Sequence, residues 1–296
     1  MKIAAYVGSK DEVELIRPVI DNLRAIGVDH IIGSDAGSRD GTAEVLMDLA
    51  QGPGFDYVRF DDLNLDPEHE ARATQDIIAR AELVGADWLL FVDADEFPRP
   101  KTGQLRDVAG LEDADALVID RFNVPLLATG PAMDLPLDKA GRGEVLLYAP
   151  DEARPATQLR VRGDTDAPWI AAIPGPKLMM RLNRGLVPRE GQHGVTAQAG
   201  HEPHLLVPRD LIIAHVPFST EARFARKMAN VQTVYAATGH KWGPDSAWHW
   251  RRWLDNVAER GGVAGEMARN TVSSLELAEL RRMGIVKTAG DLLDRG

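Results

Sequence analysis

The chain has 296 residues, 44% of them hydrophobic and 27% charged, which is the composition of an ordinary folded protein and not of a disordered or fibrous one. Its 45 acidic residues outnumber 34 basic ones and give a formal net charge of -11, which argues against a broad surface for nucleic acids or anionic membranes. The absence of cysteine excludes disulfides, thiolate metal sites and cysteine nucleophiles.

The first hundred residues alternate short apolar runs with segments of helical periodicity. Strands are expected at 3–7, 30–32, 56–60 and 88–92, and helices at 13–26, 43–50 and 68–84. Strands that alternate with helices form βα units with right-handed crossovers. The pattern therefore predicts an α/β fold with a mostly parallel central sheet flanked by helices.

The composition changes after residue 98, where proline and glycine become frequent and helical periodicity weakens up to about residue 176. Short strands are expected at 117–119, 145–148, 177–182 and 211–215, and helices at 220–237, 245–260 and 274–283. The C-terminal part is therefore predicted to be helical. The N-terminus lacks a secretory signal and no window approaches 18 uninterrupted apolar residues, so the cytoplasm is the default location.

Asp93-Ala94-Asp95-Glu96 closes the most hydrophobic of the expected strands. In an extended segment, carboxylates at i and i+2 point to one side, where they can share a divalent cation. Mg²⁺ and Mn²⁺ prefer carboxylate oxygens and leave sites for phosphate oxygens, so the pair suits diphosphate binding. An isolated pair of this kind also fits an acidic turn that keeps a strand end soluble.

A second polar segment, Gly33 to Thr42, follows the second expected strand and is rich in Gly, Ser and Asp. Its amides and side chains can hold a nucleotide, although they can equally cap the following helix. The carboxyl ends of parallel strands meet at one edge of a sheet. The two polar segments are therefore expected to face the same crevice.

These two segments carry a resemblance to a known family. The residues concerned are Ser34-Asp35-x-Gly37-Ser38-x-Asp40-Gly41-Thr42 and Asp87-Trp88-Leu89-Leu90-Phe91-Val92-Asp93-Ala94-Asp95-Glu96-Phe97. The pattern resembles family 2 glycosyltransferases of the GT-A fold, and more narrowly the branch whose strand ends in Asp-x-Asp-Glu-Phe. The resemblance covers residues 1–100 and, more loosely, 175–230, and implies a Rossmann-like nucleotide-binding half at 1–100 and an acceptor-side half at 101–218. A helical extension at 219–296 would pack on this GT-A-like domain.

The resemblance also implies site residues. Asp35 would contact the base or ribose of the donor, in a pocket lined by Glu12 and Arg72, and the expected nucleotide-sugar site also includes Val7, Ser9, Asp93, Lys177 and Lys227. Asp93 and Asp95 would meet the ribose and the metal, with His215 as a further ligand and His193 as its alternate. Lys177 and Lys227 are candidates for neutralising the departing diphosphate, because a positive charge there stabilises the developing negative charge. For each histidine a structural role, and for each lysine an ordinary surface position, is the alternative.

The expected function is a metal-dependent, inverting glycosyltransferase that uses Mn²⁺ or Mg²⁺. Its donor would be a UDP- or GDP-sugar, its acceptor a glycan or small molecule, and a peripheral membrane contact is compatible with it. Inversion needs a base for the acceptor hydroxyl, and the candidates are Glu96, His193, Glu190, Glu202 and Asp210, with Glu96 and His193 preferred.

Two alternatives remain: a nucleotide-sugar-binding protein without transferase activity, and a sugar-phosphate nucleotidyltransferase. The second normally needs a Gly-rich, basic loop after the first strand, where Gly8 to Glu12 is acidic. No G-x-G-x-x-G follows that strand, which argues against a dinucleotide oxidoreductase.

Two further segments are interpreted structurally. The run Gly200 to His204 lacks the histidine pair of a helical zinc site and is expected to be a loop. The tryptophans at 242, 248, 250 and 253, with His240 and His249 nearby, are expected to pack a C-terminal helix against the sheet, with stacking on sugar rings as the alternative.

Overall fold

The structure is a computed structural model and describes residues 1–60, 67–134, 144–197, 202–238 and 247–294. The first half contains β1 (Ile3–Ser9), α1 (Ile16–Ala25), β2 (His30–Asp35), α2 (Thr42–Leu49), β3 (Phe55–Arg59), α3 (Pro67–Leu83), β4 (Trp88–Asp93), β5 (Glu96–Pro100), η1 (Leu105–Asp107), β6 (Ala116–Ile119), β7 (Arg121–Asn123), β8 (Leu126–Leu127), β9 (Gly130–Pro131) and β10 (Leu146–Tyr148). The second half contains α4 (Arg154–Gly163), η2 (Trp169–Ala171), β11 (Lys177–Arg181), β12 (Leu186–Pro188), η3 (Glu190–Gln192), β13 (Val195–Ala197), β14 (Leu205–Leu206), β15 (Leu211–His215), α5 (Glu221–Thr238), α6 (Trp248–Glu259), α7 (Gly262–Asn270), α8 (Ser274–Arg282), β16 (Val286–Thr288) and α9 (Ala289–Leu293).

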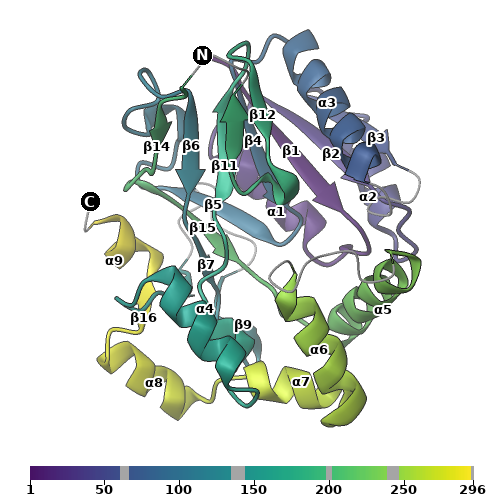
Figure 1. Cartoon of the computed structure of the whole chain (residues 1–296). Helices are drawn as coiled ribbons and strands as arrows, with labels where there is room; N and C mark the ends of the chain where they lie inside the picture. Colours follow the sequence, from purple (N-terminus) through teal and green to yellow (C-terminus); the bar gives the residue numbers. More distant parts are fainter. Residues whose placement is uncertain (61–66, 135–143, 198–201, 239–246, 295–296) are drawn as a thin grey trace.

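A seven-stranded sheet forms the centre of the molecule, in the order β14-β6-β11-β4-β1-β2-β3 (Figure 1). Strands β1 to β4 pair in parallel, as the βα pattern predicts, and within this sheet β11 runs antiparallel to both its neighbours. The mixed α/β architecture with a mostly parallel central sheet flanked by helices is therefore confirmed.

Alternate residues of the central strands face two different layers, because side chains in a strand alternate between its faces. Ile3, Ala5 and Val7 of β1 belong to a core shared with α1, α2 and the second sheet. Ala4 and the partly buried Tyr6 belong to a core that includes residues of α3 and the β12–β13 hairpin. The sheet is thus buried on both faces, which explains the continuous apolar sequence of β4.

A second, five-stranded sheet has the order β16-β10-β7-β15-β5 and is not anticipated by the sequence. Its strands are short, and β5 begins only two residues after β4 ends, with a turn at Ala94 and Asp95. A two-residue turn between two short strands gives no periodicity signal. This sheet brings the start of β5 and the ends of β7 and β15 beside the end of β4.

The segment after residue 218 is mostly helical, as expected, with α5, α6 and α7 lying together at one end of the molecule (Figure 1). Strand β16 then joins the second sheet by pairing with β10, and Ala289 and Leu293 of α9 enter the core under the central sheet. The expected helical extension does not include this return. The domain boundary itself remains a prediction.

Trp253 packs as expected for a tryptophan of a C-terminal helix, although its neighbours are Trp169, Phe218 and Phe224 in a separate core and not the central sheet. Trp248 and Trp250 pack partly buried against the same core. Trp242, His240, Gly200 and His201 lie outside the described residues.

Candidate active site

The two polar segments predicted from the sequence do lie at one edge of the central sheet. Strand β1 stands between β2 and β4, and Gly8 is in register with Ser34 on one side and with Asp93 on the other. The next pair along is Ser9 with Asp35. Helix α5 lies beyond these carboxyl ends (Figure 1). The site is therefore assembled by the register of parallel strands.

The expectation that Asp93 and Asp95 point to one side of an extended segment is wrong. Strand β4 ends at Asp93, and Asp95 lies in the turn before β5. The Asp93 side chain is 49% exposed and its carboxylate lies 2.8 Å from Nζ of Lys177. The Asp95 side chain is 6% exposed and contacts a different set of cations.

Glu96 and Lys177 lie under the exposed carboxylate of Asp93. Glu96 is fully buried, accepts a hydrogen bond from the backbone amide of Asp93 at 2.8 Å, and pairs with Arg121. Lys177 is 2% exposed and lies 3.7 Å from Glu96, because the antiparallel β11 begins at this edge of the sheet. Burial and the charge of Asp93 raise the pKa of Glu96 to about 7, against the pull of Lys177 and Arg121.

Asp95 lies among cations from α5. Its Oδ2 lies 2.8 Å from Nη2 of Arg223 and 3.0 Å from Nζ of Lys227, which stand one helical turn apart. Arg223 also donates to both carboxylate oxygens of Glu12, through its Nε and Nη2. Burial opposes ionisation of Asp95, but Lys227 and Arg223 outweigh it and hold the pKa of this carboxyl below its usual range.

Among the described residues, four carboxyl groups of this centre face four cations. The carboxylates are Glu12, Asp93, Asp95 and Glu96, and the cations are Arg121, Lys177, Arg223 and Lys227. Burying a charge without a partner is costly, and paired charges reduce that cost. Lys177 is therefore no ordinary surface lysine, and Lys227, with a side chain 22% exposed, sits at the rim of the same cluster.

His215 ends β15 and is flanked in the second sheet by Glu96 of β5 and Asn123 of β7. Its Nδ1 lies 2.8 Å from Oδ1 of Asn123, and its Nε2 lies 3.7 Å from Oδ1 of Asp95. Burial lowers the pKa of His215 well below its ordinary value, although Asp95 works in the opposite direction. The ring is therefore neutral near pH 7.

Asp95, Glu96 and His215 each offer an atom within 4.8 Å of one another, and all three are buried. Two carboxylates and one imidazole suit Mn²⁺ better than Mg²⁺, because Mg²⁺ prefers oxygen ligands and imidazole is a ligand of transition metals. Nδ1 of His215 lies against Oδ1 of Asn123, so Nε2 is the ring nitrogen that faces Asp95 and is placed to act as a metal ligand. The residues present thus fit a divalent cation. The metal ligands predicted from the sequence were Asp93, Asp95 and His215, whereas this compact group contains Glu96 in place of Asp93.

Asp35 occupies the expected edge but is engaged with its own loop. The residue is 1% exposed, and its carboxylate accepts hydrogen bonds from the backbone amides of Gly37 at 3.1 Å and of Ser38 at 3.1 and 3.2 Å. This is a turn within the loop and not a cap of the following helix, since the amide of Thr42, the first residue of α2, donates to Asp40 instead. A contact between Asp35 and a nucleotide stays a prediction.

Three other predicted nucleotide-site residues are placed differently. The Val7 side chain belongs to the core, which leaves only its backbone for a ligand. Ser9 is buried and its hydroxyl donates to the carbonyl of Ser34 at 2.7 Å. Arg72 is exposed on α3 and has no recorded contact with the charged cluster among the described residues.

His193 lies next to the charged centre, after η3. The residue is exposed, and its Nδ1 donates to the carbonyl of Pro176 at 2.7 Å, so a neutral ring keeps its lone pair on Nε2. Desolvation by the surrounding protein lowers the pKa of His193, and the positive charges of Lys177 and Arg121 lower it further. An unprotonated imidazole of this kind can accept a proton.

Glu96 is not supported as the catalytic base. It is fully buried, and Arg121 and the amide of Asp93 donate to its oxygens, so it presents no surface to an acceptor hydroxyl that enters from solvent. Asp210 accepts from the amide of Ala109 at the opposite end of β15. Glu202 is exposed, and the side chain of Glu190 lies outside the described atoms.

Sequence reasoning missed Arg121, Asn123 and Arg223. Arg223 lies 128 positions from Asp95 and 211 from Glu12 along the chain, so no local spacing links them. All three are polar or charged and prove to be buried. A buried polar residue needs a partner, but two of the three residues of β7 are polar, so its sequence does not mark Arg121 and Asn123 as core positions.

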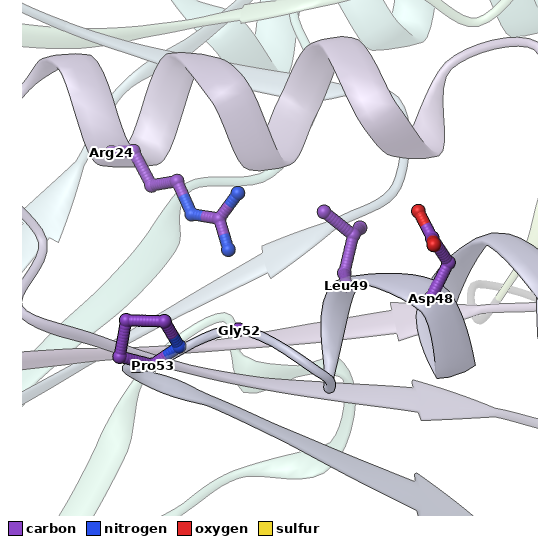
Figure 2. Close-up of a pocket in the computed structure, with 5 residues that line it drawn as sticks. All are labelled: Arg24, Asp48, Leu49, Gly52 and Pro53. Atoms are coloured by element: carbon purple, nitrogen blue, oxygen red, sulfur yellow. The ribbon is translucent and has the colours of Figure 1, made fainter.

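Two hollows lie away from this centre. One, of about 410 Å³, is lined by Arg24, Asp48, Leu49, Gly52 and Pro53 (Figure 2). It sits where α1 and α2 end, at the amino ends of the strands. The other, of about 450 Å³, is lined by residues before β15 together with Lys101, Ala109 and Leu293. Ligands of open α/β sheets bind at the carboxyl ends of the strands, so neither hollow is the expected site.

Comparisons with known proteins give fold-level likenesses only. No family model and no curated protein matches the sequence. Among solved structures, the chain is similar to Staphylococcus aureus TarS 1–349 in complex with UDP-GlcNAc, at 13% identity and TM-score 0.43, over 80% of this chain and 66% of that one. A second structure, of S. aureus TarS, aligns at 11% identity and TM-score 0.42 over 92% and 49% of the two chains.

A mycobacterial protein aligns at 16% identity and TM-score 0.36, over 83% of this chain and 76% of that one. The chain spans less than two thirds of the length of the first two TarS chains. Among the described residues, no helix is both long enough and apolar enough to cross a membrane.

Proposed function

We propose that this chain is a metal-dependent glycosyltransferase that moves a sugar from a nucleotide-diphospho-sugar to an acceptor hydroxyl. The observation that carries the proposal is the compact group of Asp95, Glu96 and His215 at the carboxyl edge of the parallel sheet, ringed by buried cations. A cation site at this edge suits a diphosphate, and the Asp-x-Asp-Glu-Phe sequence resembles the family that uses one there.

Asp95, Glu96 and His215 would hold Mn²⁺ or Mg²⁺. When bound, such an ion would offset charge on the donor's diphosphate. Lys177 and Lys227, which already pair with Asp93 and Asp95, supply further positive charge for the leaving nucleoside diphosphate. Asp93, the most exposed carboxylate of the centre, is left to contact the ribose.

His193 is the proposed base. Its Nε2 carries the lone pair, and its lowered pKa keeps the ring unprotonated near neutral pH. It would accept the proton of the acceptor hydroxyl as that oxygen attacks the anomeric carbon and the bond to the diphosphate breaks. A single displacement of this kind inverts the anomeric centre.

The test is a panel of UDP- and GDP-sugars with Mn²⁺, followed by thermal unfolding and by release of free nucleoside diphosphate. The proposal predicts that one donor raises the melting temperature in a metal-dependent way, because a ligand that binds only the folded state stabilises it. The same donor should release nucleoside diphosphate, and EDTA should abolish both effects.

His193→Gln separates binding from turnover in this panel. The variant should keep donor-induced stabilisation and lose release of nucleoside diphosphate, since its change lies outside the metal group. Stabilisation without turnover by the wild type would instead favour a nucleotide-sugar-binding protein. Release of pyrophosphate from a sugar phosphate and a nucleoside triphosphate would favour a nucleotidyltransferase, and no response to any nucleotide would overturn all three.

A further inference from the structure

We propose that Asn123 is a positioning residue that fixes the tautomer of His215. In this arrangement Nδ1 of His215 carries the proton, and the lone pair of Nε2 faces Asp95. The inference deepens the proposed function, since the metal gives that lone pair its use. The tautomer itself is a property of the chain alone and is tested without metal or donor.

The orientation of the Asn123 amide follows from its surroundings. The side chain is fully buried on β7, and Nδ2 lies 3.1 Å from the carbonyl of Ile170 and 2.7 Å from the carbonyl of Ala172. Carbonyl oxygens only accept hydrogen bonds, so both must face the amide nitrogen and its two protons. Reversing the amide would set its oxygen against two carbonyls. Oδ1 therefore points at His215.

The tautomer of His215 follows from the amide in turn. Oδ1 of Asn123 only accepts, and it lies 2.8 Å from Nδ1 of His215, so Nδ1 must donate. A neutral imidazole has one N–H, which leaves Nε2 unprotonated. Nε2 lies 3.7 Å from Oδ1 of Asp95, too far for a hydrogen bond. Two acceptors thus face each other across a gap that suits a cation.

Helix α7 is linked to Asn123 by hydrogen bonds through the backbone of Ile170. The amide of Ile170 donates to Oδ1 of Asn270 at 3.1 Å, while the carbonyl of the same residue accepts from Asn123. Asn270 in turn donates to the buried carboxylate of Glu266 at 3.0 Å. The backbone of Ile170 therefore connects α7, through the side chain of Asn123, to the ring of His215, although these residues lie far apart in the sequence.

The decisive measurement is the protonation of the His215 ring nitrogens in metal-free protein, by ¹⁵N-edited NMR of ¹⁵N-histidine samples. His215→Gln identifies the signals by their loss. In the wild type Nδ1 should carry a directly bonded proton and Nε2 none. A proton on Nε2 would overturn the inference outright, whatever any variant does.

Two variants of Asn123 distinguish positioning from a merely structural role. Asn123→Leu and Asn123→Asp both remove the donation to Ile170 and Ala172, and Asp also sets a carboxylate oxygen against those two carbonyls, so a merely structural role predicts that Asp behaves no better than Leu. The inference predicts that Asn123→Asp keeps the proton on Nδ1, because a carboxylate accepts from it, and that Asn123→Leu loses this preference. Equal behaviour of the two folded variants would contradict it.

Binding of Mn²⁺ alone, followed by electron paramagnetic resonance, is the second readout. Loss of an outer hydrogen bond to a ligating histidine typically costs about 10–100-fold in metal affinity. Asn123→Leu should weaken Mn²⁺ binding by about that factor, and Asn123→Asp by much less. If the wild type fails to bind Mn²⁺, the proposed metal role is wrong, while the ring protonation still decides the role of Asn123.

Discussion

At the scale of single residues, Asp95 is the point on which the charged centre depends. It joins two cations of α5 to the turn between β4 and β5, and its backbone carbonyl also accepts from the amide of Val216. Its loss leaves Lys227 short of its partner, while Arg223 keeps Glu12. Removal of one partner from a buried ion pair is costly because the other charge stays buried.

Asp95→Asn should therefore destabilise the fold as well as abolish Mn²⁺ binding. We expect a loss of about 3 kcal/mol in the free energy of unfolding, measured in urea. The matched control is Asp76→Asn, which breaks a 2.8 Å pair with Arg80 whose side chains are 47% and 40% exposed. That exposed pair should cost less than about 1 kcal/mol. Equal stability of the two variants would mean that Arg223 and Lys227 do not need Asp95.

The sequence identified the carboxylates and lysines of this centre but not its arginines. Asp93, Asp95 and Lys177 lie at or next to the ends of strands that the sequence predicts clearly, so their place in the fold follows from neighbouring residues alone. Arg121 and Arg223 matter because of partners distant in sequence. The compact group contains Glu96 where the sequence predicted Asp93. The turn at Asp95 causes this difference, because it places Glu96 in the interior and leaves Asp93 at the surface.

At the scale of elements, the long helices and the parallel strands were predictable and the short ones were not. Helix α3 and helix α5 agree with expectation to within one residue at each end, because their periodicity is sustained. Helix α7 was missed because it begins at a pair of glycines, Gly261 and Gly262, both with positive φ. Helix α4 lies in the segment rich in proline and glycine, where the pattern is weakest.

Helix α6 carries a pH-sensitive element. The ring centroid of His249 lies 5.3 Å from that of Trp169 and 5.0 Å from that of Trp253. Burial lowers the pKa of His249 to about 3, and Lys227 and Arg121 contribute in the same direction. The folded ring thus stays neutral, whereas an unfolded histidine takes up a proton below about pH 6.5. Stability contributed by this neutral ring is lost as the pH falls from about 6.5 towards 3.

His249→Phe should reduce this acid sensitivity, because phenylalanine keeps the aromatic contacts and does not titrate. We expect the drop in unfolding free energy between about pH 7 and about pH 5 to shrink by about 1–2 kcal/mol in urea titrations. The pKa of His215 is shifted in the same direction, so a residual dependence should remain. An unchanged drop would show that His249 is not the titrating group.

At the scale of the whole molecule, the segment after residue 218 completes a core that the earlier residues begin. Tyr148 and Trp169 share one hydrophobic cluster with Phe224, Trp253 and other residues of the later helices. Strand β16 also closes the second sheet against β10. A chain that ends at residue 218 would leave these surfaces open to water.

We expect the chain 1–218 to lack a cooperative unfolding transition and to bind a dye such as ANS, which reports exposed apolar surface. The full chain should unfold in one transition, measured by circular dichroism in urea with the same protein concentration. A cooperative transition in the shorter chain, with a urea dependence appropriate to its size, would instead support a self-sufficient domain at 1–218.

The buried pairing of Glu12 and Asp95 with Arg223 also has a consequence during synthesis. On the ribosome, the βα units of β1 to β4 emerge first and can begin to form from local contacts. More than a hundred further residues must be synthesised after Glu12 and after Asp95 before Arg223, the partner of both carboxylates, is added to the chain. The early sheet must therefore keep this edge hydrated until α5 arrives, and the centre closes late in folding, after the framework that positions it.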